Sequence, residues 1–234
     1  MRIVDLSVPL TTGMPVYPGD PRVTVAPALR VADDGVNVLH LDMGSQSGTH
    51  VDAPFHIDDA LPTLDRLPLE RFWGEAVVVD ARGADPRSPL GPALFEGRAR
   101  AGAIVLVATG WSRHWGTDAY LDHPYLTREA AEFLVAAGVR TVGVDALSVD
   151  PTPCDDFPAH RVLCGAHAVI AENLAGLDPL LDAQAAGEPV EVSLLPLRLP
   201  AADGAPVRAV ARVGRRPAQP APTSRTSPAR ERHR

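Results

Sequence analysis

The sequence contains no lysine, only two cysteines and few aromatic residues, so all 22 of its Lys and Arg residues are arginine. Cys154 and Cys164 cannot form the disulfide framework of a small secreted domain, which favours a reducing, cytoplasmic location. No apolar run approaches the roughly 20 residues of a transmembrane helix, and we expect no signal peptide at the start. With aromatics at 5%, the core must consist mainly of Val, Leu, Ala and Ile.

Charge is distributed unevenly along the chain. The formal net charge is -7, yet the residues after Val213 hold six arginines and one glutamate, which leaves about -12 on the remainder. An acidic body repels phosphate groups, so we expect neither a nucleic-acid nor a membrane partner, whereas it suits binding of a divalent cation. The stretch 214–234 has no large apolar residue and is predicted to be a disordered, Arg- and Pro-rich tail.

The remainder, residues 1–213, is long enough and apolar enough for one domain. Its patterns indicate a mixed α/β (α+β) fold, with strands early and late, helices in the middle and no strict βαβ repeat. The predicted strands are residues 23–31, 38–43, 76–80, 104–108, 141–144, 190–196 and 207–213. The predicted helices are residues 127–137, 168–175 and 90–101.

One short segment gathers several metal-ligand side chains: Gln46-Ser-Gly-Thr-His50-Val-Asp52-Ala-Pro54-Phe-His56. In a strand, His50 and Asp52 would point to the same face. Pro54 would then turn the chain, so that His56 returns toward the same point. Imidazole and carboxylate together suit Zn²⁺, Mn²⁺ or Fe²⁺. A surface loop without metal is an equally simple reading of this spacing alone.

A second cluster lies further along the chain. His160 precedes Glu172 by twelve residues, and Glu172 is flanked by Val169, Ile170 and Leu174. A carboxylate held on an apolar face needs a cation or a full set of hydrogen bonds. The alternative is a surface glutamate on a short helix.

These segments resemble the cyclase family, which includes bacterial kynurenine formamidase (arylformamidase) and isatin hydrolase. The family signature is similar to His-x-Gly-Thr-His-x-Asp-x-Pro-x-His, and segment 46–56 matches it except at Gln46. Further similar segments follow the family order: Asp5-Leu-Ser-Val-Pro-Leu, Pro15-Val-Tyr17-Pro-Gly-Asp20, Thr109-Gly-Trp111, Gly143-Val-Asp145-Ala-Leu-Ser148-Val-Asp150 and Pro206-Val-Arg208. The resemblance covers roughly residues 1–213.

The resemblance implies the family's swivelling β/β/α single domain and a homo-oligomer, a homodimer or a homotetramer. It implies that His50, Asp52, His160 and Glu172 bind metal, with Gln46 at the fifth ligand position. His56 would be the proton donor and acceptor. Tyr17 occupies the place of a substrate-contacting Trp in the formamidases. The cofactor would be one or two ions of Zn²⁺ or Mn²⁺, and Gln46, a harder ligand than His, favours a single or harder ion.

The function predicted is therefore that of a metal-dependent hydrolase. It would cleave a C–N bond of an amide, formamide or cyclic amide in a small molecule, through metal-bound water and His56 as general base. A lactone hydrolase or a cyclase of secondary metabolism is the alternative enzyme. A metal-binding protein without catalysis, with Gln46 marking a decayed site, is the alternative from another class.

Overall fold

The computed structural model describes residues 1–214, so the predicted tail lies, apart from Gly214, outside the described residues, and the domain limit at residue 213 stays a prediction. The main sheet contains β1 (Arg2–Asp5), β4 (His50–Asp52), β5 (Trp73–Asp80), β7 (Ile104–Ala108), β9 (Thr141–Val144), β10 (Val169–Glu172), β11 (Val190–Ser193), β12 (Gly204–Pro206) and β13 (Val210–Val213). Two further pairs are β2 (Thr24–Leu29) with β3 (Val38–Asp42) and β6 (Pro89–Leu90) with β8 (Tyr125–Leu126). The helices are α1 (Val31–Asp34), α2 (Arg128–Ala136), α3 (Pro158–Gly165) and α4 (Asp178–Ala185).

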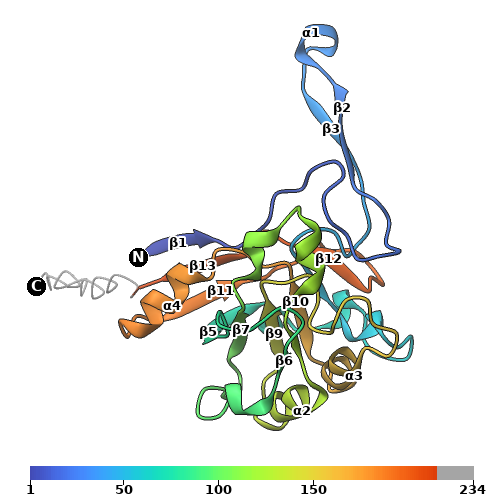
Figure 1. The fold of residues 1–234 in the computed structure, drawn as a ribbon. Helices are drawn as coiled ribbons and strands as arrows, with labels where there is room; N and C mark the ends of the chain where they lie inside the picture. Colours follow the sequence, from blue (N-terminus) through green and yellow to red (C-terminus); the bar gives the residue numbers. More distant parts are fainter. Residues whose placement is uncertain (215–234) are drawn as a thin grey trace, which may run out of the picture.

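The nine strands of the main sheet follow the order β1-β13-β11-β5-β7-β9-β10-β4-β12. The central strands β5, β7, β9 and β10 are parallel, and the strands on both flanks are antiparallel. The middle of the chain thus runs β7-α2-β9-α3-β10 (Figure 1). Parallel neighbours require such crossovers. The middle of the chain therefore alternates helix and strand, where the sequence predicts mainly helices.

The two faces of the sheet carry separate apolar cores. In β7, Ile104 and Leu106 contribute to the core that includes Leu180 of α4. Their neighbours Val105 and Val107 contribute to the core beneath α2 and α3. This alternation follows from the two-residue period of a strand, and β7 is apolar throughout because both of its faces are covered.

Helix α2 shows how the sequence specifies its ends. Thr127 caps the first turn, its Oγ1 accepting a hydrogen bond from Ala130 N at 3.1 Å. Gly138 follows the helix with φ of +82°, and a Cβ there would lie 2.8 Å from the Ala101 Cβ. The helix predicted at 127–137 is confirmed because both its cap and its stop are local signals.

Two predicted helices are wrong. Residues 168–175 contain the buried strand β10, and residues 90–101 contain the end of β6 and one 3-10 turn, Pro92–Leu94. The periodicity of a short apolar run does not distinguish a buried strand from a helix. Residues 169–172 form a strand because they pair with β9 and β4 on either side. The mixed α/β single-domain prediction itself is confirmed.

The pair β2–β3, with α1 at its tip, projects from the body of the molecule (Figure 1). Every residue of β3 is exposed. An isolated two-stranded hairpin is marginally stable in water, so this arm lacks the packing that stabilises the other strands. Among the described residues, no helix is long and apolar enough to cross a bilayer.

Candidate metal centre and active site

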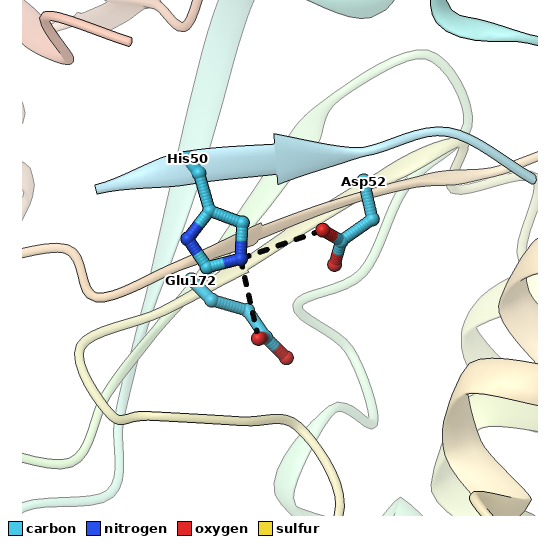
Figure 2. Close-up of side chains that lie close together, drawn as sticks. All are labelled: His50, Asp52 and Glu172. Carbon is cyan, nitrogen blue, oxygen red and sulfur yellow. Dashed lines mark ion pairs between the residues drawn. The ribbon is translucent and has the colours of Figure 1, made fainter. Parts of the chain in front are cut away.

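The side chains of His50, Asp52 and Glu172 meet because β4 and β10 are antiparallel neighbours. Glu172 lies directly opposite His50, and Ile170 lies opposite Asp52. Since alternate residues share a face, all three ligand-type side chains emerge on the side of the sheet that α3 covers. Figure 2 shows them converging from the two strands, with one nitrogen of the His50 ring facing both carboxylates.

His160 closes the group from the facing helix. Its Nε2 lies 3.7 Å from Asp52 Oδ2 and 3.5 Å from Glu172 Oε1. His50 Nε2 lies 3.4 Å from Asp52 Oδ1 and 3.6 Å from Glu172 Oε2. All four residues are buried. Side chains separated by more than 100 residues in the sequence thus surround one point.

The separations between these ligand atoms fit a metal ion. Bonds of about 2.1 Å in a tetrahedral site place neighbouring ligand atoms about 3.4 Å apart. Both oxygens of Asp52 are buried and have no hydrogen-bond partner among the described residues. Because an unpartnered buried carboxylate is costly, a cation is the partner that this arrangement requires. Ligand atoms of His50, Asp52 and Glu172 lie within 4.8 Å of one another.

A contact at the second ring nitrogen, Nδ1, orients each of the two histidine rings. His50 Nδ1 lies 2.8 Å from the Gly48 carbonyl, and His160 Nδ1 lies 2.7 Å from Asp150 Oδ2. A proton on each Nδ1 makes these contacts hydrogen bonds and leaves the Nε2 lone pair for a metal. Gly48 has φ of +65°, and a Cβ there would meet the Leu10 Cδ2 at 2.5 Å, so glycine is needed in this turn.

The carboxylates attract positive charge to this centre. Burial alone lowers the pKa of His50 and of His160, but neighbouring carboxylates outweigh it and raise these pKa values to about 9 and about 10. Burial likewise tends to raise the pKa of Asp52, and the nearby histidines hold it below its usual value. In the metal-free protein, protons on the two rings provide the charge that a divalent cation would replace.

His56 and Gln46 lie beside this centre. The 3-10 turn Pro54–His56 follows β4 and brings the His56 ring back, with its centroid 5.9 Å from that of His160. Gln46 Nε2 lies 3.1 Å from His56 Nδ1, and Gln46 Oε1 is buried without a hydrogen-bond partner among the described residues. Both side chains line the same cavity as His50, His160 and Glu172.

This cavity has a volume of about 420 Å³ and opens beside the four clustered side chains. Tyr17 and Phe157 form part of its wall, with ring centroids 6.1 Å apart. The Tyr17 hydroxyl accepts a hydrogen bond of 2.9 Å from Cys154 N, which holds the ring in place. The wall also contains the carboxyl group of Asp20, and burial raises the pKa of this group. No arginine is among the described lining residues.

Comparison with known proteins places this site in a family. Residues 4–151 match the family model Cyclase, described as "Putative cyclase". Kynurenine formamidase of Salinibacter ruber is 33% identical over 217 residues, covering 91% of this chain and 98% of that protein. Kynurenine formamidase of Bacillus mycoides is 35% identical over 214 residues, covering 89% and 96%.

Solved structures agree with these matches. An isatin hydrolase bound to the product analogue thioisatinate has a TM-score of 0.80 at 25% identity, with 90% of this chain and 91% of that chain covered. Isatin hydrolase A of Labrenzia aggregata, bound to benzyl benzoate, has a TM-score of 0.78 at 28% identity, with 90% and 93% covered.

The chain belongs to the cyclase family. The class predicted from the sequence, a metal-dependent hydrolase acting on a C–N bond outside peptides, is confirmed by these relatives and by the clustered ligands. The individual roles of the site residues stay predictions. The structure brings together His50, Asp52, His160 and Glu172, and it lines the adjoining cavity with Tyr17, Gln46 and His56.

Three further polar residues, not predicted from the sequence, support the site. Asp150 stood within a family-like segment without a role, and it is fully buried against His160. Asn173 donates from Nδ2 to the Gly48 carbonyl at 2.9 Å. Asp203 lies against Gln46 and His56. Each acts on residues in another element of the fold, so no local pattern indicates them.

Proposed function

We propose that this protein hydrolyses N-aryl formamides or closely related aryl amides, such as N-formylkynurenine, with one bound divalent metal ion. The observation that carries the proposal is the convergence of two imidazoles and two buried carboxylates beside a cavity of about 420 Å³. Kynurenine formamidases at 33–35% identity and nearly full coverage support the formamide.

The metal ligands in this proposal are His50 Nε2, His160 Nε2 and the carboxylates of Asp52 and Glu172. Gln46 Oε1, buried and without a partner among the described residues, is the fifth candidate donor. Two nitrogens and several hard oxygens suit Zn²⁺ or Mn²⁺. A divalent ion held there supplies Lewis-acid activation of water and of the substrate carbonyl.

His56 is the group that moves protons. Its Nδ1 faces Gln46 and Asp203, so Nε2 is the nitrogen left for exchange in the cavity. His56 Nε2 takes a proton from the attacking water as the water oxygen bonds to the formyl carbon. The same nitrogen then returns this proton to the leaving arylamine nitrogen, and formate is released.

The walls of the cavity position the substrate. Tyr17 and Phe157 offer aromatic surfaces to an aryl ring, and Leu147 and Ile57 add apolar contact. Asp20 provides a negative charge that favours an ammonium group over a carboxylate. The preferred substrates therefore have an aromatic ring, and the substituent that lies near Asp20 is neutral or cationic.

The test is turnover of the metal-loaded enzyme and its His56→Ala variant on N-formylkynurenine, formanilide, isatin and a lactone. We expect chelator-sensitive hydrolysis of the formamides, and a loss of about 10²- to 10⁴-fold in kcat for His56→Ala with metal content unchanged. His167→Asn, at an exposed position outside the lining of this cavity, is the matched control. Turnover of the lactone alone favours the alternative enzyme, and bound metal without turnover favours the non-catalytic protein.

The proposal includes a homo-oligomer built with the β2–β3 arm. Large apolar side chains are exposed on this arm at Leu29, Val31, Val36, Val38, Leu39 and Leu41. Large apolar side chains gathered on one projecting element favour contact with another surface, and a second copy of the chain is the occupant proposed. Light scattering after chromatography should give a multiple of 24.8 kDa, and Leu39→Asp with Leu41→Asp should give the monomer. A wild-type monomer contradicts this part.

A cytoplasmic location also belongs to the proposal. Cys154 and Cys164 are free thiols, which suits a reducing compartment. Fractionation of cells that express the chain tests it, and recovery outside the cytoplasmic fraction contradicts it.

A further inference from the structure

The carboxylate of Asp203 lies beside both Gln46 and His56, outside the group of clustered metal-ligand side chains. Gln46 Nε2 lies 2.7 Å from Asp203 Oδ2 and 3.1 Å from His56 Nδ1. His56 Nδ1 lies 3.4 Å from the same Asp203 oxygen. The three atoms form a closed triangle, although Asp203 is separated from the other two residues by 157 and 147 positions.

The position of Asp203 is fixed by its surroundings. Ser45 Oγ donates to the carboxylate, at 2.9 Å from Oδ1 and 3.1 Å from Oδ2. Ala53 N donates to the Asp203 carbonyl at 2.7 Å, which attaches this segment to the end of β4. At Gly204, a Cβ would lie 2.6 Å from Gln46 Nε2, so glycine leaves the space that the amide occupies. The backbone and a neighbouring hydroxyl thus hold the carboxylate where it meets both partners.

Asp203 determines which way the Gln46 amide points. A carboxylate oxygen only accepts hydrogen bonds, so the amide NH₂ must face it. The reversed amide would place two acceptors 2.7 Å apart. Gln46 Oε1 is therefore turned away from Asp203 and remains the atom available as a ligand.

Asp203 also discriminates between the two neutral forms of His56. When Nδ1 lacks a proton, it accepts from Gln46 Nε2, and the proton sits on Nε2. When Nδ1 carries the proton, it donates to Asp203 Oδ2, and the Nε2 lone pair is free. Only the second form is able to accept a proton in the cavity.

We propose that Asp203 is a positioning residue for the reaction, holding His56 in the form with a proton on Nδ1. This inference rests on the proposed function, in which His56 is the base. When His56 Nε2 accepts a proton, the Nδ1 proton remains on the ring and is stabilised by Asp203, as an acidic residue does for a catalytic histidine elsewhere. Asp203 itself touches no reacting atom.

Two measurements on Asp203→Asn test this role. The first is kcat on formanilide with the zinc-loaded enzyme, where we expect a loss of at least 100-fold, little change in KM and unchanged zinc content. Asp203→Glu should recover part of the loss, and Asp59→Asn, an exposed carboxyl on the following turn, should behave as wild type. In a His56→Ala background, Asp203→Asn should cause no further loss, because it acts through His56.

The second measurement does not depend on turnover. The ¹⁵N chemical shifts of His56 in the metal-free protein should show the proton on Nδ1 in wild type and on Nε2 in Asp203→Asn. An unchanged shift pattern with unchanged kcat overturns the inference, as does a loss of equal size in the His56→Ala background. If instead His56→Ala keeps full activity, the proposed function fails. The ¹⁵N shifts still report whether Asp203 determines which nitrogen of the His56 ring carries the proton.

Discussion

His160 and Asp150 form a buried pair in which Nδ1 of the ring lies 2.7 Å from Oδ2 of the carboxylate. The same carboxylate accepts hydrogen bonds from the backbone N–H groups of Ala159 and His160, at 2.8 and 3.0 Å. Asp150 therefore caps the first turn of α3 and aims the His160 ring with one side chain.

Asp150→Asn should weaken metal binding while the four ligand-type side chains remain. An asparagine oxygen accepts fewer and weaker hydrogen bonds than a carboxylate, so both the ring orientation and the ring basicity suffer. We expect a loss of about 10- to 100-fold in metal affinity, measured by competition with a chromophoric chelator.

Asp155→Asn is the control for this prediction, because Asp155 is exposed in the same loop. Equal affinities of Asp150→Asn and wild type would show that α3 positions His160 without this carboxylate.

The contrast between β7 and β10 shows what the sequence determines locally. Strand β7 lies at its predicted limits, because Ile104 to Ala108 is an uninterrupted apolar run bounded by turn residues. Strand β10 has a similar run, but it follows α3 almost directly, and its sequence alone predicts a helix. Only its pairing with β9 and β4 distinguishes the two, and that pairing is a tertiary property.

The site divides in the same way. His50, Asp52 and His56 lie in one short segment, so strand parity and Pro54 suffice to bring them together. The apolar flanks of Glu172 indicate a buried ligand, but only the family resemblance joins Glu172 and His160 to this segment, since no spacing rule places β10 next to β4. Asp150 and Asp203 carry no local signal, because their roles depend on hydrogen bonds to residues in other elements.

Removing the metal should lower the thermal stability of the protein. A ligand present at about 1,000 times its Kd stabilises the folded state by about 4 kcal/mol, or roughly 10 °C in Tm for a chain of this size. Asp52→Asn should abolish this difference, because both Asp52 oxygens face the centre and have no other partner among the described residues. Calorimetry with and without chelator measures it.

Asp182→Asn, an exposed carboxylate in α4, should keep the wild-type difference in Tm. A chelator effect that persists in Asp52→Asn would place the metal elsewhere in the protein.

Acid should destabilise the protein partly through His123. This ring is buried, with Nε2 2.8 Å from Thr152 Oγ1, and burial lowers its pKa below the usual 6.5. The unfolded chain therefore binds a proton at a higher pH than the folded chain does. The stabilising contribution is complete above pH 6.5 and decreases as the pH falls toward the lowered pKa, by at most about 1.4 kcal/mol per pH unit.

Urea unfolding at pH 7, 6 and 5 measures this slope, and His123→Gln should make it shallower than wild type. The exposed His167→Asn should leave the slope unchanged. Parallel slopes for all three proteins would assign the acid sensitivity to other groups.

Charge selectivity should depend on Asp20. For formanilides that carry an ammonium, a neutral or a carboxylate substituent, kcat/KM of the wild type should fall in that order, because Asp20 lines a cavity without a described arginine. Asp20→Asn should reduce the preference for ammonium over carboxylate roughly tenfold, the factor that 1.4 kcal/mol gives. The neutral substrate should change little, and the exposed Asp118→Asn should leave all three unaffected. An equal loss on all three substrates in Asp20→Asn would instead mean that Asp20 supports the structure of the site, since a structural fault does not distinguish the charge of the substrate.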